Sequence, residues 1–235
     1  PPRSTLFPYT TLFRSGRLAE AENTGLSTTA SATSLALADI DGDGDLDLYC
    51  THYIDVMYLA DRTTSFALAR RGDRWEVTKV NGESTRLPRW RGRFEAFGGG
   101  RVRELPEADG LYRNDGRGHF TPIQSEPGVF ADPAGASIPP FRDWGLAAMF
   151  RDLNGDGAPD LYVCNDNASP DRMWINTGQG RFRLADPLLQ RHTSRSSMGV
   201  DFADVNRDGR DDFLVLDMLA RERVKRLTQL VRDLP

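Results

Sequence analysis

Three acidic windows of nine residues recur along the chain, and each one runs directly into an apolar segment. They are DIDGDGDLD (39–47), DLNGDGAPD (152–160) and DVNRDGRDD (204–212), and all obey the pattern D-x-[DN]-x-D-G-x-x-D. Self-similarity at this scale is typical of repeat architectures, in which each copy is one supersecondary unit packed against its neighbours. The windows therefore limit the possible folds more than any other feature.

The segments around the windows alternate with period two rather than with the helical period of 3.6. LDLYC, DLYVC and DFLVL follow the windows, while SLALAD, GLAAMF and MGVDFA precede them. This pattern predicts that each window is a tight loop joining two short, mostly buried strands.

A second element recurs as LYRNDGRGHF (111–120) and MWINTGQGRF (173–182), with GRL at 16–18 as the tail of an earlier copy. NDGRG and NTGQG are predicted to be hairpin turns, because Asn and Gly accept the positive backbone angles that such turns need. Several short strands in the 52 residues from Asp152 to Asp204 are typical of a propeller blade. The predicted fold class is all-β, a partial β-propeller with three blade-like repeats.

Residues 1–15 are set aside from this fold. Read back through codons, TLFPYTTLFRS (5–15) matches a sequencing-library adapter, so we interpret it as an assembly artefact and assign residues 16–235 to the propeller fragment. The first copy has 64 positions from Asp47 to Leu111 against 13 from Asp160 to Met173, which predicts an insertion at about 52–104. A shorter insertion is expected within ADPAGASIPP (131–140).

The longer insertion interleaves arginines with Trp75, Trp90 and Phe94. Such a stretch is able to bind acidic glycans or nucleic acid. The preferred interpretation is a solvated loop whose aromatic side chains pack onto the blade. Its RGD tripeptide at 71–73 is expected by chance in an arginine-rich stretch.

The clustered carboxylates predict divalent cations, because groups of like charge this close repel one another unless a cation lies between them. Ca²⁺ takes about six to eight oxygen ligands, and a loop with acids at positions one, three, five and nine can supply them. Mg²⁺ is disfavoured because it keeps several waters. We expect about three Ca²⁺ ions. The predicted side-chain ligands are Asp39, Asp41, Asp43 and Asp47; Asp152, Asn154, Asp156 and Asp160; and Asp204, Asn206, Asp208 and Asp212, with the seventh residues Asp45, Ala158 and Arg210 offering their carbonyls.

Two alternatives compete with these sites. Each window read alone is also a plausible solvated acidic turn, since Asp and Gly favour turns. An EF-hand loop begins in the same way but needs a glutamate at position twelve, where this chain has Cys50, Val163 and Val215.

On these motifs the chain resembles the calcium-binding blades of FG-GAP/VCBS repeats, a family that includes the integrin α-subunit propeller. DLYVCNDNASPDRMWINTGQGRF and SMGVDFADVNRDGRDDFLVLDM further resemble bacterial secreted proteins related to cartilage acidic protein, which carry an ASPIC/UnbV module. The resemblance implies a seven-bladed propeller outside the cytoplasm, calcium in its loops and a role in adhesion. The Gly-Ala-Pro element of integrin repeats is absent, and no ASPIC/UnbV region lies in this chain, so the integrin partner is not carried over.

The expected function is thus a secreted or surface calcium-binding propeller for adhesion or for protein or glycan interaction, located outside the cell, on its surface or in the periplasm. The sequence shows no nucleophile elbow, phosphate loop or zinc-ligand spacing, which argues against an enzyme. The alternative is the propeller part of an extracellular polysaccharide lyase or hydrolase. No nucleic-acid partner is expected, and no apolar run is long enough to span a membrane. Cys50 and Cys164 are expected to be buried free thiols facing opposite sides of equivalent strands.

Overall fold

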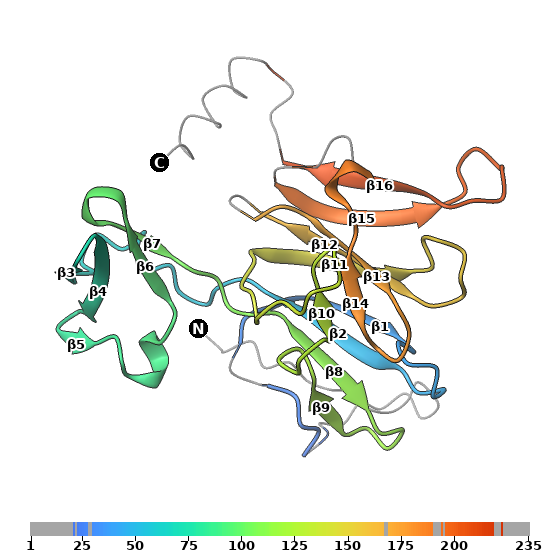
Figure 1. The fold of residues 1–235 in the computed structure, drawn as a ribbon, viewed down its shortest axis with the longest axis horizontal. Coiled ribbons are helices and arrows are strands. Elements are labelled where there is room, and N and C mark those ends of the chain that lie inside the picture. The colour runs from blue at the N-terminus through green and yellow to red at the C-terminus, as the bar shows by residue number, and fades with distance from the viewer. Residues whose placement is uncertain are drawn as a thin grey trace. The chain divides into compact units, whose positions relative to one another are not determined.

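The computed structural model describes residues 21, 23–27, 30–166, 169–189, 194, 196–218 and 222. Their regular structure consists of strands and three short 3₁₀ turns, η1 (Pro88–Trp90), η2 (Gly98–Gly100) and η3 (Pro187–Leu189), so the predicted all-β class is confirmed (Figure 1). Two compact units are present, one formed by residues up to Tyr53 with those from Ala108 onward, the other by Ile54–Glu107. The adapter segment 1–15 and GRL at 16–18 lie outside the described residues, and their interpretation stays a prediction.

The larger unit contains three sheets that correspond to the three repeats. The first blade has the strand order β1-β2-β8-β9, with β1 (Ala32–Ala38), β2 (Asp47–His52), β8 (Gly110–Asn114) and β9 (Phe120–Pro122). The second has the order β10-β14-β13-β12-β11, with β10 (Phe130–Ala131), β11 (Gly145–Arg151), β12 (Asp160–Asn165), β13 (Arg172–Asn176) and β14 (Phe182–Leu184). The third pairs β15 (Ser197–Ala203) with β16 (Asp212–Asp217).

Each acidic window joins two paired antiparallel strands, β1 to β2, β11 to β12 and β15 to β16, as the period-two pattern predicts. The register is the same in every copy. The residue before each window pairs with the last aspartate of that window: Ala38 with Asp47, Arg151 with Asp160 and Ala203 with Asp212. All three pairs also carry an irregularity at the far end of the first strand. The turns NDGRG and NTGQG connect β8 to β9 and β13 to β14, as predicted.

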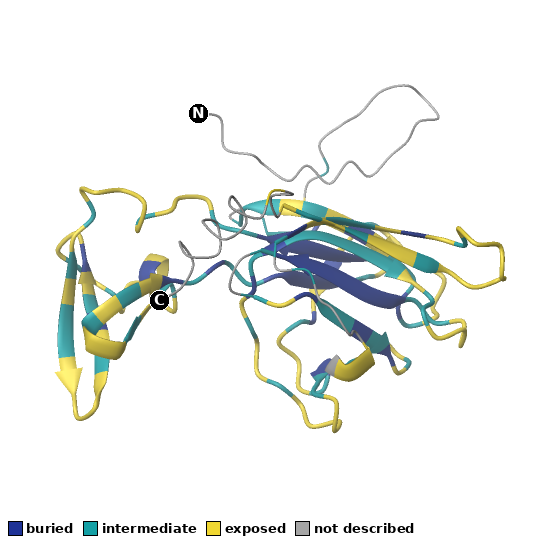
Figure 2. Ribbon diagram, turned by 90° about the horizontal axis from the view of Figure 1, so that it is seen from above, coloured by how far each residue is buried: buried dark blue, intermediate teal, exposed yellow. Residues whose placement is uncertain are grey.

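The blades pack face to face, which gives a propeller-like arrangement. The cluster between the first and second blades contains Tyr49, Leu111, Val163 and Trp174, with Trp174 completely buried. The cluster between the second and third blades contains Tyr162, Phe202 and Val215. In Figure 2 the buried positions of this unit gather along its strands, whereas the loops are exposed.

The predicted insertion at 131–140 has a structural consequence. It follows β10, which pairs in parallel with β14 and adds a fifth strand to the second blade. Phe130 of β10 lies 4.7 Å from the ring of Trp174, centroid to centroid, so this strand also contributes to the core.

Cys50 and Cys164 are both buried and unbridged, as predicted. Cys50 packs with Leu48 and Tyr112, whereas Cys164 packs with Tyr162 and Phe202 toward the third blade. The two thiols therefore face opposite sides of equivalent strands. Burial raises the pKa of each thiol to about 12.

Apolar side chains remain exposed on the outer face of the third blade. Leu214 is 65% exposed and Leu216 is 60% exposed. The repeat places Leu214 at the same position as Tyr49 and Tyr162, which are 1% and 2% exposed because another blade covers them. This face therefore has the composition of a blade interface, and no sheet among the described residues covers it.

The smaller unit folds around its own core. It comprises β3 (Phe66–Arg71), β4 (Arg74–Val80) and β5 (Glu83–Ser84) in one sheet and the hairpin of β6 (Phe94–Phe97) and β7 (Arg101–Glu104). The expected solvated loop with aromatics packed onto the blade is wrong here. Trp90 is 5% exposed within a cluster that includes Val77, Val80 and Phe94. Charged residues interrupt the apolar ones along this segment, so its sequence shows no regular strand period. The apolar side chains that remain are nevertheless enough for a small core.

Candidate metal-binding loops

The first acidic loop turns sharply around Asp39, the residue that follows β1. Gly42 and Gly44 have φ angles of 82° and 93°, a left-handed conformation that is strained for other residues. These turns direct the backbone N–H groups of Gly42, Asp43 and Gly44 at the Asp39 carboxylate, with N···O distances of 2.8, 3.1 and 3.0 Å. The loop thus holds the Asp39 side chain in a fixed position.

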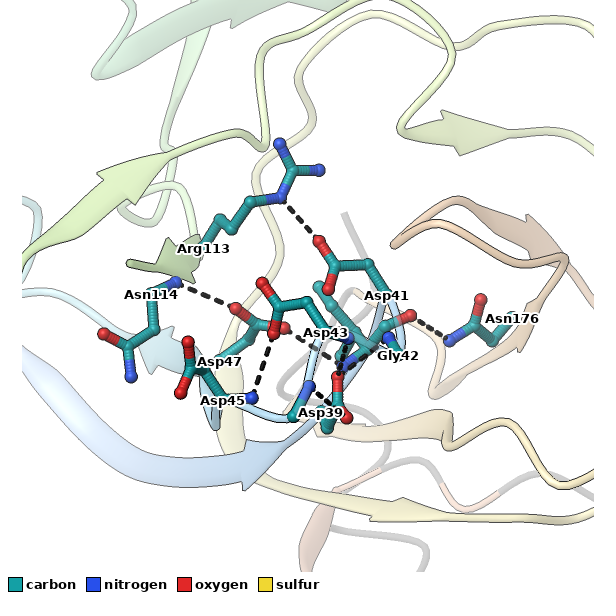
Figure 3. Close-up of polar contacts among 11 residues, drawn as sticks. Asp39, Asp41, Gly42, Asp43, Asp45, Asp47, Arg113, Asn114 and Asn176 are labelled. Atoms are coloured by element: carbon teal, nitrogen blue, oxygen red, sulfur yellow. Dashed lines mark hydrogen bonds and ion pairs between the residues drawn. The ribbon is translucent and has the colours of Figure 1, made fainter. Parts of the chain in front are cut away.

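Three carboxylates converge inside this loop. One oxygen from each of Asp39, Asp41 and Asp43 lies within 4.8 Å of the others (Figure 3). Asp41 Oδ1 is buried and has no hydrogen-bond partner among the described residues, while Asp41 Oδ2 lies 2.9 Å from Arg113 Nε. Arg113 Nε is itself without an aligned hydrogen bond, so we treat this contact as an ion pair only. A buried carboxylate oxygen without a partner is costly, and a divalent cation is the species that three converging carboxylates suit.

Asp45, at the seventh position, does not point into this cluster. Its backbone N–H donates to Asp43 Oδ1 at 2.9 Å, and a Cβ built on Gly116 would lie 2.3 Å from Asp45 Oδ2. The side chain is therefore directed at the β8–β9 turn. That the carbonyl of the seventh residue is the ligand stays a prediction.

Asp47, at the ninth position, connects the loop to the rest of the blade. Its side chain is fully buried, Oδ2 accepts the N–H of Ile40 at 3.0 Å, and Oδ1 accepts the N–H of Asn114 at 2.8 Å. Burial raises the pKa of Asp47, and the two N–H donors act in the opposite direction. Since each carboxylate oxygen has two lone pairs, the predicted ligand role stays open beside this structural one.

The second loop repeats this arrangement almost atom for atom. Asp152 accepts N–H groups from Gly155, Asp156 and Gly157 at 2.8, 3.2 and 2.9 Å. Asp160 accepts from the N–H of Leu153 and of Asn176 at 2.9 and 2.7 Å. The difference is at the third position, where Asn154 donates from Nδ2 to Asp156 Oδ2 at 2.9 Å. The amide of Asn154 therefore replaces the carboxylate that Asp41 supplies in the first loop, which removes one negative charge. At the seventh position Ala158 contributes only backbone atoms.

In the third loop the first aspartate again accepts backbone N–H groups, but the hydrogen bond to the ninth aspartate is longer. Asp204 accepts N–H groups from Asp208 and Gly209 at 3.0 and 2.9 Å, while the contact from Val205 N to Asp212 lengthens to 3.3 Å. Asn206 accepts from Asp208 N, and Arg210 N donates to Asp208, as the seventh residues of the other loops do. At the fourth position Arg207 takes a φ of 63°, where the other two loops have glycine. This loop is thus the most strained of the three.

The repeat contains one recurring feature that was not predicted from the sequence. Tyr49 donates to Asp109 Oδ2 at 2.7 Å, and Tyr162 donates to Asp171 Oδ2 at 2.8 Å, so each complete blade contains a buried tyrosine–aspartate pair. Desolvation raises the pKa of Asp109 to about 7. The signal was present, because a D-L-Y triplet (47–49 and 160–162) and a D-x4-N pattern (109–114 and 171–176) recur in both copies.

The family comparison agrees with the repeat. The FG-GAP-like repeat model matches residues 8–50 and 152–215. These ranges include β1 and most of β2 in the first blade, β12, β13 and β14 in the second, and β15 and most of β16 in the third. The match begins within the segment interpreted as adapter-derived, whose origin it leaves open. No curated protein sequence matches the chain significantly. The two matches support an FG-GAP repeat protein, and this repeat is structural rather than catalytic. No helix among the described residues is long and apolar enough to cross a membrane.

Proposed function

We propose that the chain is a calcium-stabilised propeller protein, located outside the cytoplasm, that serves adhesion or protein or glycan interaction. The observation that carries this proposal is the convergence of Asp39, Asp41 and Asp43 around a buried Asp41 oxygen that has no partner in the described structure. The equivalent positions of the other loops would hold two further ions. A bound cation would remove the repulsion between these carboxylates and fix each loop to its blade.

The location follows from the affinity expected of such loops. Extracellular calcium modules bind with Kd values of about 10⁻⁴–10⁻³ M, so they are filled only where calcium is near millimolar. A site at about tenfold excess of calcium over Kd adds about 1.4 kcal/mol of stability, a sizeable part of the usual 5–15 kcal/mol. Calcium would then act on stability, and the interaction role would belong to exposed surfaces.

The test is a calcium titration of the full chain, followed by calorimetric melting and by metal analysis after dialysis. The Tm is expected to rise with calcium, and Asp43→Asn is expected to remove one bound ion and part of this rise. Asp73→Asn is the matched control, since the Asp73 side chain is fully exposed at the β3–β4 turn. A chain that retains no calcium from millimolar buffer, or that melts identically in chelator, would disprove the proposal.

The structural nature of the repeat favours this role over the lyase or hydrolase alternative. All three acidic windows occupy equivalent hairpin loops, whereas a catalytic acid pair would be expected at one position only.

A further inference from the structure

The smaller unit contains an open cleft that neither the repeat nor the acidic loops explain. It has a volume of about 680 Å³ and is lined mainly by residues of β4, β5 and β6. This volume is within the range of about 300–1,000 Å³ that is usual for ligand sites. Its lining residues include Trp75, Lys79, Thr78, Arg86 and Glu95.

The cleft has an excess of positive charge. Its acidic side chains are already paired, because Glu76 lies 2.8 Å from Arg71 and Glu95 lies 2.6 Å from Arg103. Lys79 and Arg86 are exposed and form no ion pair among the described residues. The whole unit, Ile54–Glu107, has eleven Arg and Lys against eight Asp and Glu, although the complete chain has a net charge of −4. Charge complementarity therefore favours an anionic ligand.

The cleft also has an aromatic wall. Trp75 is half-buried on the face of β4 that carries the core residue Val77. Gly100 supports its ring, since a Cβ at Gly100 would lie 3.6 and 3.7 Å from the ring-fusion carbons of Trp75 and 3.5 Å from Leu68 Cδ1. A supported indole offers a flat face with negative charge density, which attracts the C–H groups of a sugar ring.

We propose that this cleft binds an acidic oligosaccharide, with a sugar ring stacked on Trp75 and carboxylates paired with Lys79 and Arg86. Nucleic acid fits less well, because recognition of a single strand uses several successive aromatic platforms, whereas Trp75 is joined in this cleft only by the partly buried Phe94. The inference deepens the glycan-interaction role proposed above but needs no metal in the acidic loops.

The test measures binding of hexagalacturonic acid to the full chain by calorimetry in millimolar calcium. Saturable binding that weakens with salt is expected, with maltohexaose, a neutral hexamer, bound at least about tenfold more weakly. The double variant K79A/R86A and the single variant Trp75→Ala are each expected to lower the affinity by about tenfold, whereas Trp75→Phe retains most of it. Arg74→Ala, an exposed arginine outside the cleft, is the matched control and leaves binding unchanged.

Three results would overturn the inference: no binding of hexagalacturonic acid, equal binding of maltohexaose, or tighter binding of a thymidine oligonucleotide of matched charge. Each variant is melted in parallel. K79A/R86A and Arg74→Ala are expected to keep the parent Tm because their side chains are exposed. Trp75→Ala is expected to lower the Tm because the indole is half-buried against Gly100, and Trp75→Phe is the conservative variant whose Tm is expected to stay near the parent's. If binding fails while calcium still raises the Tm, the cleft assignment alone is wrong. If binding occurs without any calcium effect on the Tm, the acidic loops are turns and the cleft stands.

Discussion

One matched pair of substitutions in the first window can distinguish the role of the ninth aspartate, Asp47, from the role of the three converging carboxylates. Asp47→Asn should destabilise the chain even without metal, because the native carboxylate accepts the buried N–H of Ile40 and the partly buried N–H of Asn114. Asparagine keeps one of these bonds and turns its own NH₂ toward the other donor. Asp43→Asn should have little effect without metal, since Asp43 Oδ1 accepts only the N–H of Asp45, a bond that asparagine retains.

The two substitutions are therefore expected to differ in how much unfolding free energy they remove as well as in whether the loss depends on metal. Losing a hydrogen bond to a charged group costs about 1.5–3 kcal/mol, and the buried N–H left behind raises the total for Asp47→Asn to about 3 kcal/mol. At about 2–4 °C per kcal/mol for a unit of this size, its Tm should fall by about 6–12 °C in chelator. Asp43→Asn should stay within about 0.5 kcal/mol of the parent in chelator and lose about 1.4 kcal/mol of the calcium effect.

The assay is differential scanning calorimetry of both variants and the parent, with chelator and with millimolar calcium, following the transition that calcium shifts. Retained strand content by circular dichroism shows that both variants still fold. If Asp47→Asn melts with the parent in chelator, the hydrogen bonds of Asp47 contribute no net stability, and the role assigned to the ninth position is incorrect.

Substituting Arg207 by glycine should raise stability by about 1 kcal/mol, because its φ of 63° is strained for a side chain; a lower denaturation midpoint would contradict this. The raised pKa of Asp109 means that the folded chain holds a proton there which the unfolded chain releases, so this stabilisation is complete below about pH 4 and is lost as the pH rises through about 7. Chemical unfolding across this range should show a slope of at most about 1.4 kcal/mol per pH unit from this group, absent in Asp109→Asn. Replacing Leu214 and Leu216 by lysine should reduce self-association by light scattering without lowering the Tm, since both side chains are largely exposed; a marked loss of Tm would mean that another sheet covers this face.

Much of the larger unit follows from local pattern. Period-two alternation around the windows located β1 and β2 and their equivalents, and the turns NDGRG and NTGQG located the hairpins, because both signals depend on neighbouring residues alone. The convergence of Asp39, Asp41 and Asp43 was predictable from spacing for the same reason.

The positions that escaped prediction depend on contacts distant in sequence. Asp47 accepts an N–H from Asn114, and the residues of the smaller unit lie between these two positions in the sequence. Nothing in the nine-residue window indicates that partner. The pair of Tyr49 with Asp109 spans a similar distance. The core around Trp90 was missed because arginines between the apolar residues obscure any simple period.

The first acidic loop also contacts the neighbouring blade, since Asn176 Nδ2 and Gly180 N donate to the Ile40 carbonyl at 2.9 and 3.0 Å. Such contacts make the blades a linear array with nearest-neighbour coupling, in which order in one unit lowers the free energy of ordering the next. Calcium in the first loop would then favour folding of the second blade as well as its own. Amide hydrogen exchange should accordingly be slowest where the first two blades meet and fastest in β15 and β16, and filling the first loop should extend protection into β13.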